Sequence, residues 1–227
     1  MTYASMDEIA QEVKQWEFIL QLPEEIAGFH KVIDGTKEGK LLTIGSYVNE
    51  SLHAKVDIVY TSETFDYILI RTRGLNTYRD VRFVYKERDI FAQEVEKALP
   101  SILAEMSHPE KVNLGEMVAN KGILTWEYGS NLPTTMGDFN LYIKPSAAME
   151  YINGSIIFID YSNMEHKNQL LIFYNRLRDE FFGEVKIKGV FHATKDFDSK
   201  TLGELKQKLE GNLKKTLQAI SAKEPVL

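Results

Sequence analysis

Cysteine is absent from this chain of 227 residues, and its absence removes several chemistries at once. Without thiols the chain has no disulfide, no thiolate metal site and no cysteine nucleophile. Five histidines remain as nitrogen ligands. No two of them stand two or four residues apart, the spacings that place two imidazoles on one face of a strand or a helix. The sequence therefore predicts neither a metal site nor a cofactor.

Long apolar runs and an excess of basic residues are also lacking. No stretch approaches the roughly 18 to 20 apolar residues that a membrane helix needs. The start, MTYASMDEIAQEVKQW, has no basic residue before Lys14, unlike a signal peptide. We therefore expect a cytoplasmic protein without a membrane partner. The 27 basic and 33 acidic residues give a net charge of −6, which argues against nucleic acid as a partner.

The sequence motifs of common catalytic sites are missing as well. The chain contains no Gly-x-Ser-x-Gly elbow and no Gly-x-Gly-x-x-Gly fingerprint. The segment from Gly35 to Lys40 resembles a phosphate loop, but its glycines are one residue too close and Leu41 replaces the metal-binding hydroxyl. We interpret it as a hairpin loop. An enzyme would need a site assembled from distant residues, for which the candidates are His30, His192, Asp57, Asp160 and Arg71.

The residues that are present predict a globular protein with both helices and strands. The chain is 44% apolar and 26% charged, as is usual for globular domains. Helical spacing of Ile9, Val13, Trp16 and Leu20 predicts one helix over residues 6–21, which Pro23 ends. Apolar residues then alternate with polar ones in short runs separated by turn residues. Strands are expected over 28–34, 40–48, 53–61, 65–73 and 78–86, and their short connections favour an antiparallel meander.

Two further helices are expected, one after each run of strands. Apolar residues from Ile90 to Met106 return to helical spacing, but Pro100 should kink this helix or divide it in two. A leucine stripe marks the second helix, over about 202–220. Asp198 or Ser199 can cap this helix, and Thr201 and Glu204 have the spacing of a capping box.

The second half of the chain repeats the pattern of the first. Residues 28–36 align with 122–130, a shift of about 94, and the following strands align in order until the shift reaches about 110 at the end. We interpret the chain as an α+β protein of two related repeats, residues 1–108 and 109–227. Each repeat is a curved antiparallel sheet of about five strands followed by a long helix, and an N-terminal helix precedes the first. The alternative is a single α+β domain of irregular topology.

Arginine is distributed unevenly and supplies the main site hypothesis. All seven arginines lie in residues 71–88 and 176–178, and the first segment carries a local charge of +4. Arginines two apart in a strand share a face, and the guanidinium group suits bidentate binding of carboxylate or phosphate. The alternative is a solvated sheet face whose arginines pair with nearby acids. The predicted anion-binding residues are Arg71, Arg73, Arg82, Arg176 and Arg178.

Aromatic residues supply the second site hypothesis. Tyrosines crowd into the strand segments, and a curved sheet that grips a helix can leave a cavity lined by them, with Tyr67 and Tyr174 as candidates. The favoured function is a binding or interaction protein, without catalysis, that recognises an anionic or partly apolar ligand or a protein partner. It would act through a sheet face or a groove between the repeats. The alternatives are the enzyme above and a structural subunit that pairs strand edges into a homo-oligomer.

Overall fold

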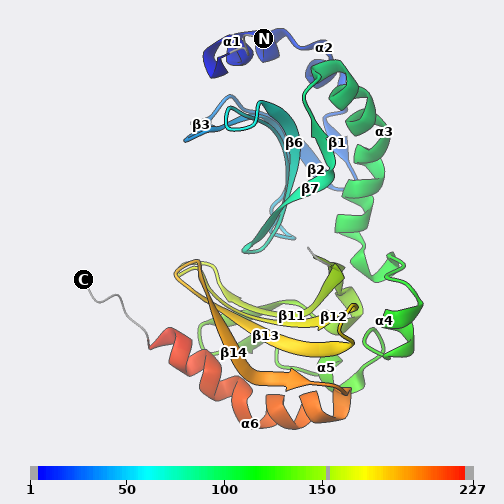
Figure 1. The fold of residues 1–227 in the computed structure, drawn as a ribbon, viewed down its shortest axis with the longest axis vertical. Helices are drawn as coiled ribbons and strands as arrows, with labels where there is room; N and C mark the ends of the chain where they lie inside the picture. Colours follow the sequence, from blue (N-terminus) through cyan, green and yellow to red (C-terminus); the bar gives the residue numbers. More distant parts are fainter. Residues whose placement is uncertain (1–4, 152–153, 223–227) are drawn as a thin grey trace. The chain divides into compact units, whose positions relative to one another are not determined.

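The computed structural model of the protein describes residues 5–151 and 154–222. The chain divides into two compact units, Met1–Ser107 and His108–Leu227. Each unit contains a seven-stranded antiparallel sheet followed by a long helix, and a short helix opens the first unit (Figure 1). The predicted α+β class with two sheet-and-helix repeats is therefore confirmed. Each sheet has the five longer strands that were expected and two further strands of two residues, which are too short to show a periodic pattern.

In the first unit the strands follow one another as an antiparallel meander. The sheet order is β1-β2-β4-β5-β6-β7, and β3 pairs with the start of β4, at Leu41 and Leu42, before the residues that pair with β2. The elements are α1 (Met6–Glu12), the 3₁₀ turn η1 (Val13–Gln15), α2 (Glu17–Gln21), β1 (Glu25–Ile26), β2 (Phe29–Ile33), β3 (Lys37–Glu38), β4 (Leu41–Asn49), β5 (Ala54–Thr61), β6 (Asp66–Arg73), β7 (Asn76–Tyr85) and α3 (Arg88–Ser107).

The second unit has the same strand order. Its sheet runs β8-β9-β11-β12-β13-β14, and β10 pairs with β11 as β3 pairs with β4. The elements are η2 (Pro109–Lys111), α4 (Glu116–Asn120), α5 (Glu127–Ser130), β8 (Thr135–Met136), β9 (Phe139–Ile143), η3 (Pro145–Ala147), β10 (Met149–Glu150), β11 (Ser155–Asn163), β12 (Asn168–Asn175), β13 (Glu180–Ile187), β14 (Val190–Ser199) and α6 (Leu202–Ser221). The shared order indicates a duplication.

The residue alignment predicted for the two repeats is wrong, although the repeat itself is present. From β4 onward, equivalent elements begin at numbers that differ by 114: 41 and 155 for β4 and β11, 88 and 202 for α3 and α6. From α2 to β2 the difference is 110, as for α2 at 17 and α5 at 127, and for β3 and β10 it is 112. The predicted shift of about 94 therefore matched segments that are not equivalent. Short alternating strands fit one another in many registers, so their pattern alone does not select the correct one.

The two tryptophans of the chain mark the correct register of the repeats. Trp-Glu-Phe at 16–18 corresponds to Trp-Glu-Tyr at 126–128, and a Leu-Pro pair follows in both units. The hydroxyl of Tyr47 on β4 donates a hydrogen bond to the carbonyl of Pro23. The hydroxyl of Tyr161 on β11 donates to the carbonyl of Pro133 at 2.6 Å. Each unit thus ties the segment after its short helix to the same place on its sheet, and burial raises the pKa of both tyrosines to about 12.

The expected N-terminal helix is interrupted. Its residues form α1, the turn η1 and α2, with extended backbone at Trp16 (ψ 107°) between the last two. The break lets the Trp16 side chain enter the core, where it is 7% exposed. Burial of the apolar surface of a tryptophan contributes more free energy than the hydrogen bonds of one regular helical turn would.

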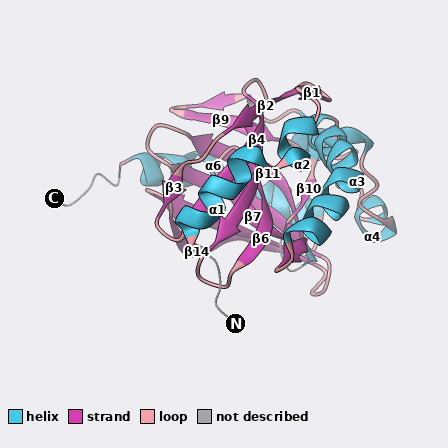
Figure 2. Ribbon diagram, turned by 90° about the horizontal axis from the view of Figure 1, so that it is seen from above, coloured by secondary structure: helices cyan, strands magenta, loops and turns pink. Residues whose placement is uncertain are grey.

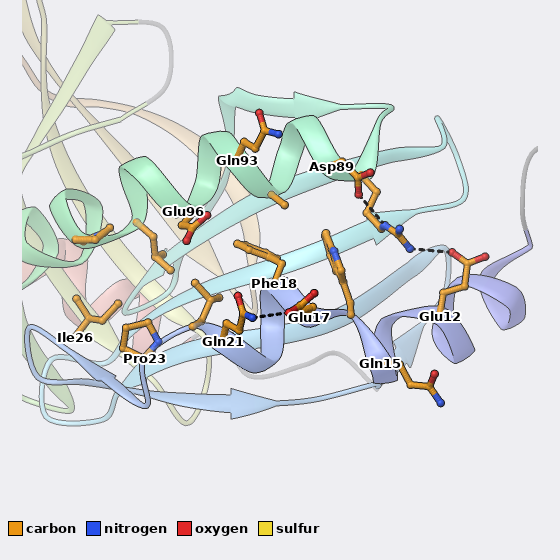
Figure 3. Close-up of a pocket in the computed structure, with 16 residues that line it drawn as sticks. Glu12, Gln15, Glu17, Phe18, Gln21, Pro23, Ile26, Asp89, Gln93 and Glu96 are labelled. Carbon is orange, nitrogen blue, oxygen red and sulfur yellow. Dashed lines mark hydrogen bonds and ion pairs between the residues drawn. The ribbon is translucent and has the colours of Figure 1, made fainter.

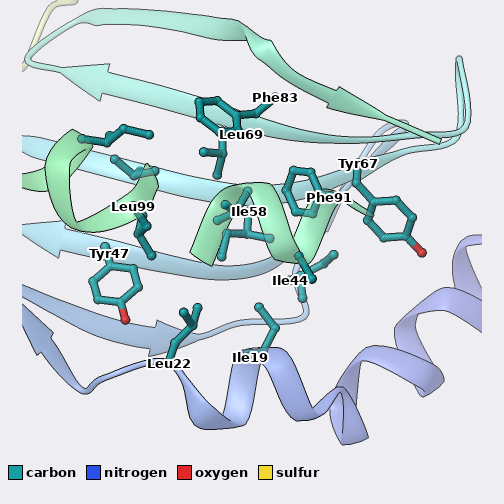
Figure 4. Packing of buried hydrophobic residues seen from close by; sticks show 14 of the residues in the cluster. Ile19, Leu22, Ile44, Tyr47, Ile58, Tyr67, Leu69, Phe83, Phe91 and Leu99 are labelled. Carbon is teal, nitrogen blue, oxygen red and sulfur yellow. The ribbon is translucent and has the colours of Figure 1, made fainter. Parts of the chain in front are cut away.

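The helix α3 covers one face of the first sheet and completes the core. Figure 4 shows Phe91 and Leu99 of α3 packed among the buried residues Ile58 and Leu69 of the sheet, with Ile19 of α2 below them in this view. The helix runs unbroken from Arg88 to Ser107, so the prediction that Pro100 divides it is wrong. Burial of its apolar stripe stabilises the helix by more than the loss of the one hydrogen bond that proline removes.

The second unit repeats this packing with α6. The leucine stripe predicted for this helix is buried, and Thr201 is its N-cap, accepting a hydrogen bond from the Glu204 amide. Among the described residues, no helix is long and apolar enough to span a membrane.

Candidate binding groove in the first unit

A groove of about 630 Å³ runs between the α1–α2 segment and α3 of the first unit. Both views of the fold place α2 beside α3 (Figures 1 and 2). The groove exists because α2 is short and ends at Gln21, which leaves the middle of α3 partly uncovered. Its volume lies within the range of small-molecule sites, about 300 to 1,000 Å³.

The floor of the groove is apolar. Trp16 and Phe18 contribute two rings whose centroids lie 4.9 Å apart. Aliphatic side chains from α3 and from the turn before β1 complete the floor, so a ligand in the groove would remove apolar surface from water. The apolar lining residues are Trp16, Phe18, Leu22, Pro23, Ile26, Ala92, Leu99 and Pro100.

The rim of the groove is acidic. Glu12, Glu17, Asp89 and Glu96 face a single basic residue, Arg88, so the charged lining residues sum to −3 (Figure 3). Four carboxylates at the mouth of an apolar cavity favour a cationic ligand, because field lines concentrate in a low-dielectric cleft.

Arg88 is already neutralised within the groove. Its Nη1 lies 3.3 Å from Glu12 Oε2, and its Nε donates to Asp89 Oδ1 at 3.3 Å (Figure 3). The guanidinium carbon also lies 5.6 Å from the centre of the Trp16 ring, a cation–π contact. The groove therefore contains one example of a cation held between an aromatic ring and carboxylates.

Of the four carboxylates in the groove, Glu96 alone has no hydrogen-bond or ion-pair partner among the described residues. By contrast, Glu17 accepts a hydrogen bond from Gln21 Nε2 at 2.6 Å. The backbone around Glu96 is also unusual, because Pro100 follows four residues later and has no N–H for the Glu96 carbonyl. Side chain and main chain thus offer acceptor oxygens at one position of α3.

Three of the predicted arginines lie in the first unit, two of them in a charged cluster. Arg71 and Asp80 share the face that α3 covers, are nearly fully buried, and form an ion pair with Nη2 2.5 Å from Oδ2. Arg82 binds the same carboxylate through Nε at 2.9 Å and Nη2 at 2.8 Å. Although burial disfavours the carboxylate, the Arg82 hydrogen bonds and the two cations hold the pKa of Asp80 below its ordinary value.

Arg73 and Tyr67 also have internal roles. Arg73 Nη1 donates to the carbonyl of Met106 at 2.6 Å, where a cation suits the C-terminal end of α3. Tyr67 packs in the core, 5.8 Å from Trp16 and 5.7 Å from Phe91 between ring centres, and burial raises its pKa to about 12.

The predicted residues of the second unit do not correspond to those of the first. Arg176 and Arg178 lie in the turn between β12 and β13. Arg176 pairs with Glu150 at 2.9 Å, and Arg178 pairs with Glu180 at 3.6 Å. The position equivalent to Arg71, 114 residues later, is Val185. Tyr174 is buried and donates to Asp179 Oδ1 at 2.8 Å; burial raises its pKa to about 12.

The candidate residues of the enzyme alternative are either exposed or in contact with residues of their own unit. His30 and His192 are exposed on strands. Asp57 accepts a hydrogen bond from Ser46 and pairs with Lys55 at 2.8 Å. Asp160 is buried and accepts hydrogen bonds from Ser162 at 2.5 Å and Gln169 at 3.0 Å. Within the described ranges, no group of three acidic or histidine side chains could hold a metal ion.

None of the seven predicted site residues is among the sixteen described residues that line the groove. The groove residues Phe18, Ala92 and Glu96 have no local motif that marks them as a site. One signal was available: the Trp-Glu-aromatic tripeptide occurs at 16–18 and again at 126–128. It would have aligned the repeats and shown where their helices differ.

No protein-family model, curated protein or solved structure matches the chain. The functional argument therefore depends on the groove and on the differences between the two units.

Proposed function

We propose that this chain is a binding protein, without catalysis, whose first unit holds a ligand in the groove between α2 and α3. The ligand has an apolar body and a cationic end. The observation that carries the proposal is an aromatic and aliphatic floor beneath a rim of charge −3, whose one cation is already paired.

Both parts of such a ligand would contribute favourably to the free energy of binding. Apolar surface that leaves water contributes about 25 cal/mol per Å². A cation over an aromatic ring contributes about 0.5 to 1 kcal/mol at exposed sites and about 2 kcal/mol when it is desolvated. The unpartnered carboxylate of Glu96 adds charge complementarity, which mainly sets specificity and the association rate.

The contacts of the arginines favour this ligand over an anion. The guanidinium groups of Arg71, Arg82, Arg176 and Arg178 already pair with carboxylates of their own unit. An anionic ligand would have to displace those carboxylates. The anion-binding sheet face, the enzyme and the homo-oligomer stay predictions, and the groove supports the cationic ligand better than any of them.

Binding can be followed through Trp16, which lies in the groove floor. A Trp126→Phe variant removes the other tryptophan and leaves Trp16 as the only indole reporter. Three probes with the same six-carbon chain test the groove: hexylammonium, hexanol and hexanoate. We expect at least one to change Trp16 fluorescence with a Kd on the order of 1 mM, a typical strength for so small a ligand.

The matched control is Ala92→Met, which fills the groove with an uncharged side chain. The equivalent position of the second unit holds a lysine, so this fold accommodates a long side chain there. We expect the Ala92→Met variant to lose the fluorescence response. If none of the three probes alters Trp16 in the parent protein, the groove is not a ligand site and the proposal is wrong.

A further inference from the structure

The second unit contains its own version of several groove residues. Trp126 and Tyr128 correspond to Trp16 and Phe18, and Glu210 corresponds to Glu96. Lys206 stands where the first unit has Ala92, since α6 and α3 are 114 residues apart. The aromatic pair and the carboxylate are thus common to both units. The helices differ at Ala92 and Lys206, and also at the rim, where Leu202 and Gly203 replace Arg88 and Asp89.

In the second unit the lysine occupies the space between ring and carboxylate. The Nζ of Lys206 lies 5.3 Å from the centre of the Tyr128 ring. The same atom lies 3.9 Å from Glu210 Oε1, one helical turn further along. Burial and the charge of Glu210 raise the pKa of Tyr128. The aromatic residue and the glutamate therefore bind a primary ammonium group from within the chain.

In the first unit the ammonium group is missing while its binding partners remain. Ala92, Phe18 and Glu96 all line the groove, and Figure 3 labels Phe18 and Glu96. Alanine reaches neither the ring nor the carboxylate, so the space that the Lys206 side chain fills in the second unit stays open.

A further difference between α3 and α6 also favours an ammonium ligand in the first unit. Lys214 stands in α6 where α3 has Pro100, and Lys214 has the N–H that proline lacks. The carbonyl of Glu96 therefore lacks the usual helical donor, and Pro100 itself lines the groove. An ammonium group carries three N–H donors and can serve two acceptors at once.

We propose that the groove of the first unit binds a small primary alkylamine in its ammonium form. This inference rests on the proposed function and specifies its ligand. The ammonium lies between the Phe18 ring and the Glu96 carboxylate, as Lys206 does between Tyr128 and Glu210. The alkyl body lies along Pro23, Ile26 and Pro100, apolar lining residues whose side chains are at least partly exposed. Arg88 already covers the Trp16 ring with a guanidinium group, so Phe18 is the ring left for the ligand.

The first experiment compares the three six-carbon probes on the Trp126→Phe protein. We expect hexylammonium to bind at least tenfold more tightly than hexanol and hexanoate. Glu96→Gln should weaken hexylammonium about fivefold to tenfold and leave hexanol unchanged, while Glu17→Gln, on the same rim, should have little effect. Equal response to all three probes would overturn the amine assignment and leave the binding function intact.

The second experiment exchanges the distinguishing residue. Ala92→Lys should abolish hexylammonium binding in the first unit, because the new ammonium occupies the site. Lys206→Ala in a Trp16→Phe background should create a hexylammonium site that Trp126 reports, whereas Lys206→Met should not. Should Lys206→Ala gain no such site while circular dichroism shows that the variant is folded, the equivalence on which the inference depends is wrong.

A third probe separates a free amine from a lysine side chain of a protein. A blocked Leu-Lys-Leu tripeptide presents the same ammonium on a peptide backbone. We expect it to bind more weakly than hexylammonium. Tighter binding of the tripeptide than of hexylammonium would overturn the small-ligand proposal in favour of a polypeptide partner.

Discussion

At the scale of single residues, the two units show which buried side chains the fold requires. The buried ion pair of Arg71 and Asp80 has no counterpart in the second unit, where Val185 and Thr194 occupy the equivalent positions. The same sheet thus forms with an apolar and a hydroxyl side chain there. The ion pair is a feature of the first unit and not a condition of folding.

Substitution of the pair by the residues of the second unit tests this view. Arg71→Val alone leaves the Asp80 carboxylate with one cation fewer, and Asp80→Thr alone leaves Arg71 buried without its counter-charge. We expect each single variant to lose about 3 to 5 kcal/mol in free energy of unfolding. The Arg71→Val/Asp80→Thr double variant should lose less than either, as measured by urea unfolding. A double variant that loses the sum of both would contradict this expectation.

The same carboxylate predicts a pH dependence. The folded protein holds the pKa of Asp80 below its unfolded value of about 3.9. The ionised carboxylate therefore stabilises the fold above that pH, and the stabilisation is lost as the pH falls through the lower, folded pKa. We expect the free energy of unfolding to decrease below about pH 4. In urea titrations this acid-dependent decrease should be smaller in the double variant, which has no carboxylate at this position.

At the scale of elements, each unit depends on a link between a strand and the segment after its short helix. Tyr47 and Tyr161 provide it through hydrogen bonds to the carbonyls of Pro23 and Pro133. Removal of the hydroxyl leaves a carbonyl without its donor, which costs about 1 to 3 kcal/mol where water cannot replace it.

We therefore expect Tyr47→Phe and Tyr161→Phe each to lower the free energy of unfolding by about 1 to 3 kcal/mol. Denaturant unfolding measures both, and Tyr85→Phe, at a half-buried position of the same core, is the control. A loss confined to one of the two variants would mean that the link is not equivalent in the two units.

Helix α3 contains a proline that its counterpart α6 lacks. Proline within a helix costs about 3 kcal/mol relative to alanine. Pro100→Ala restores the hydrogen bond to the Glu96 carbonyl, and we expect it to raise the free energy of unfolding by about 1 to 3 kcal/mol. A thermal unfolding curve that stays unchanged would show that the helix has already relaxed around the proline.

At the scale of the whole molecule, each unit has its own main core, beneath its long helix. Leu103 of α3 belongs to the first and Leu217 of α6 to the second, and the two positions are equivalent. Both leucines are almost completely buried. The cavity left by a leucine-to-alanine change acts first on the residues packed around it.

We expect Leu103→Ala and Leu217→Ala each to cost about 2 to 5 kcal/mol. Hydrogen exchange should locate the two effects in different places. In Leu103→Ala the amides of β4 to β6 should exchange faster, and in Leu217→Ala those of β11 to β13. Equal acceleration in both sheets by either variant would contradict two independent cores.

Patterns within single segments were predicted well, and relations between segments were not. The stripe from Leu205 to Ile220 identified α6, because one exposed amphipathic helix shows its period in the sequence. The break at Trp16 was missed, because the gain from burying the indole depends on a core that forms from distant strands. The arginine cluster was found as a charged segment, but its partner Asp80 and its burial under α3 depend on the pairing of β6 with β7.

The sequence by itself determined the class of the protein: helices where apolar residues recur every three to four positions, strands where they alternate, and two copies of that order. Only the tertiary structure decided the register of the copies, because strand patterns repeat every two residues and match one another at many shifts. It also decided the site. Phe18 and Glu96 are 78 residues apart, and only the packing of α2 against α3 makes them walls of one groove. Once the register was known, Ala92 and Lys206 became comparable, and that comparison identified the ligand class we propose.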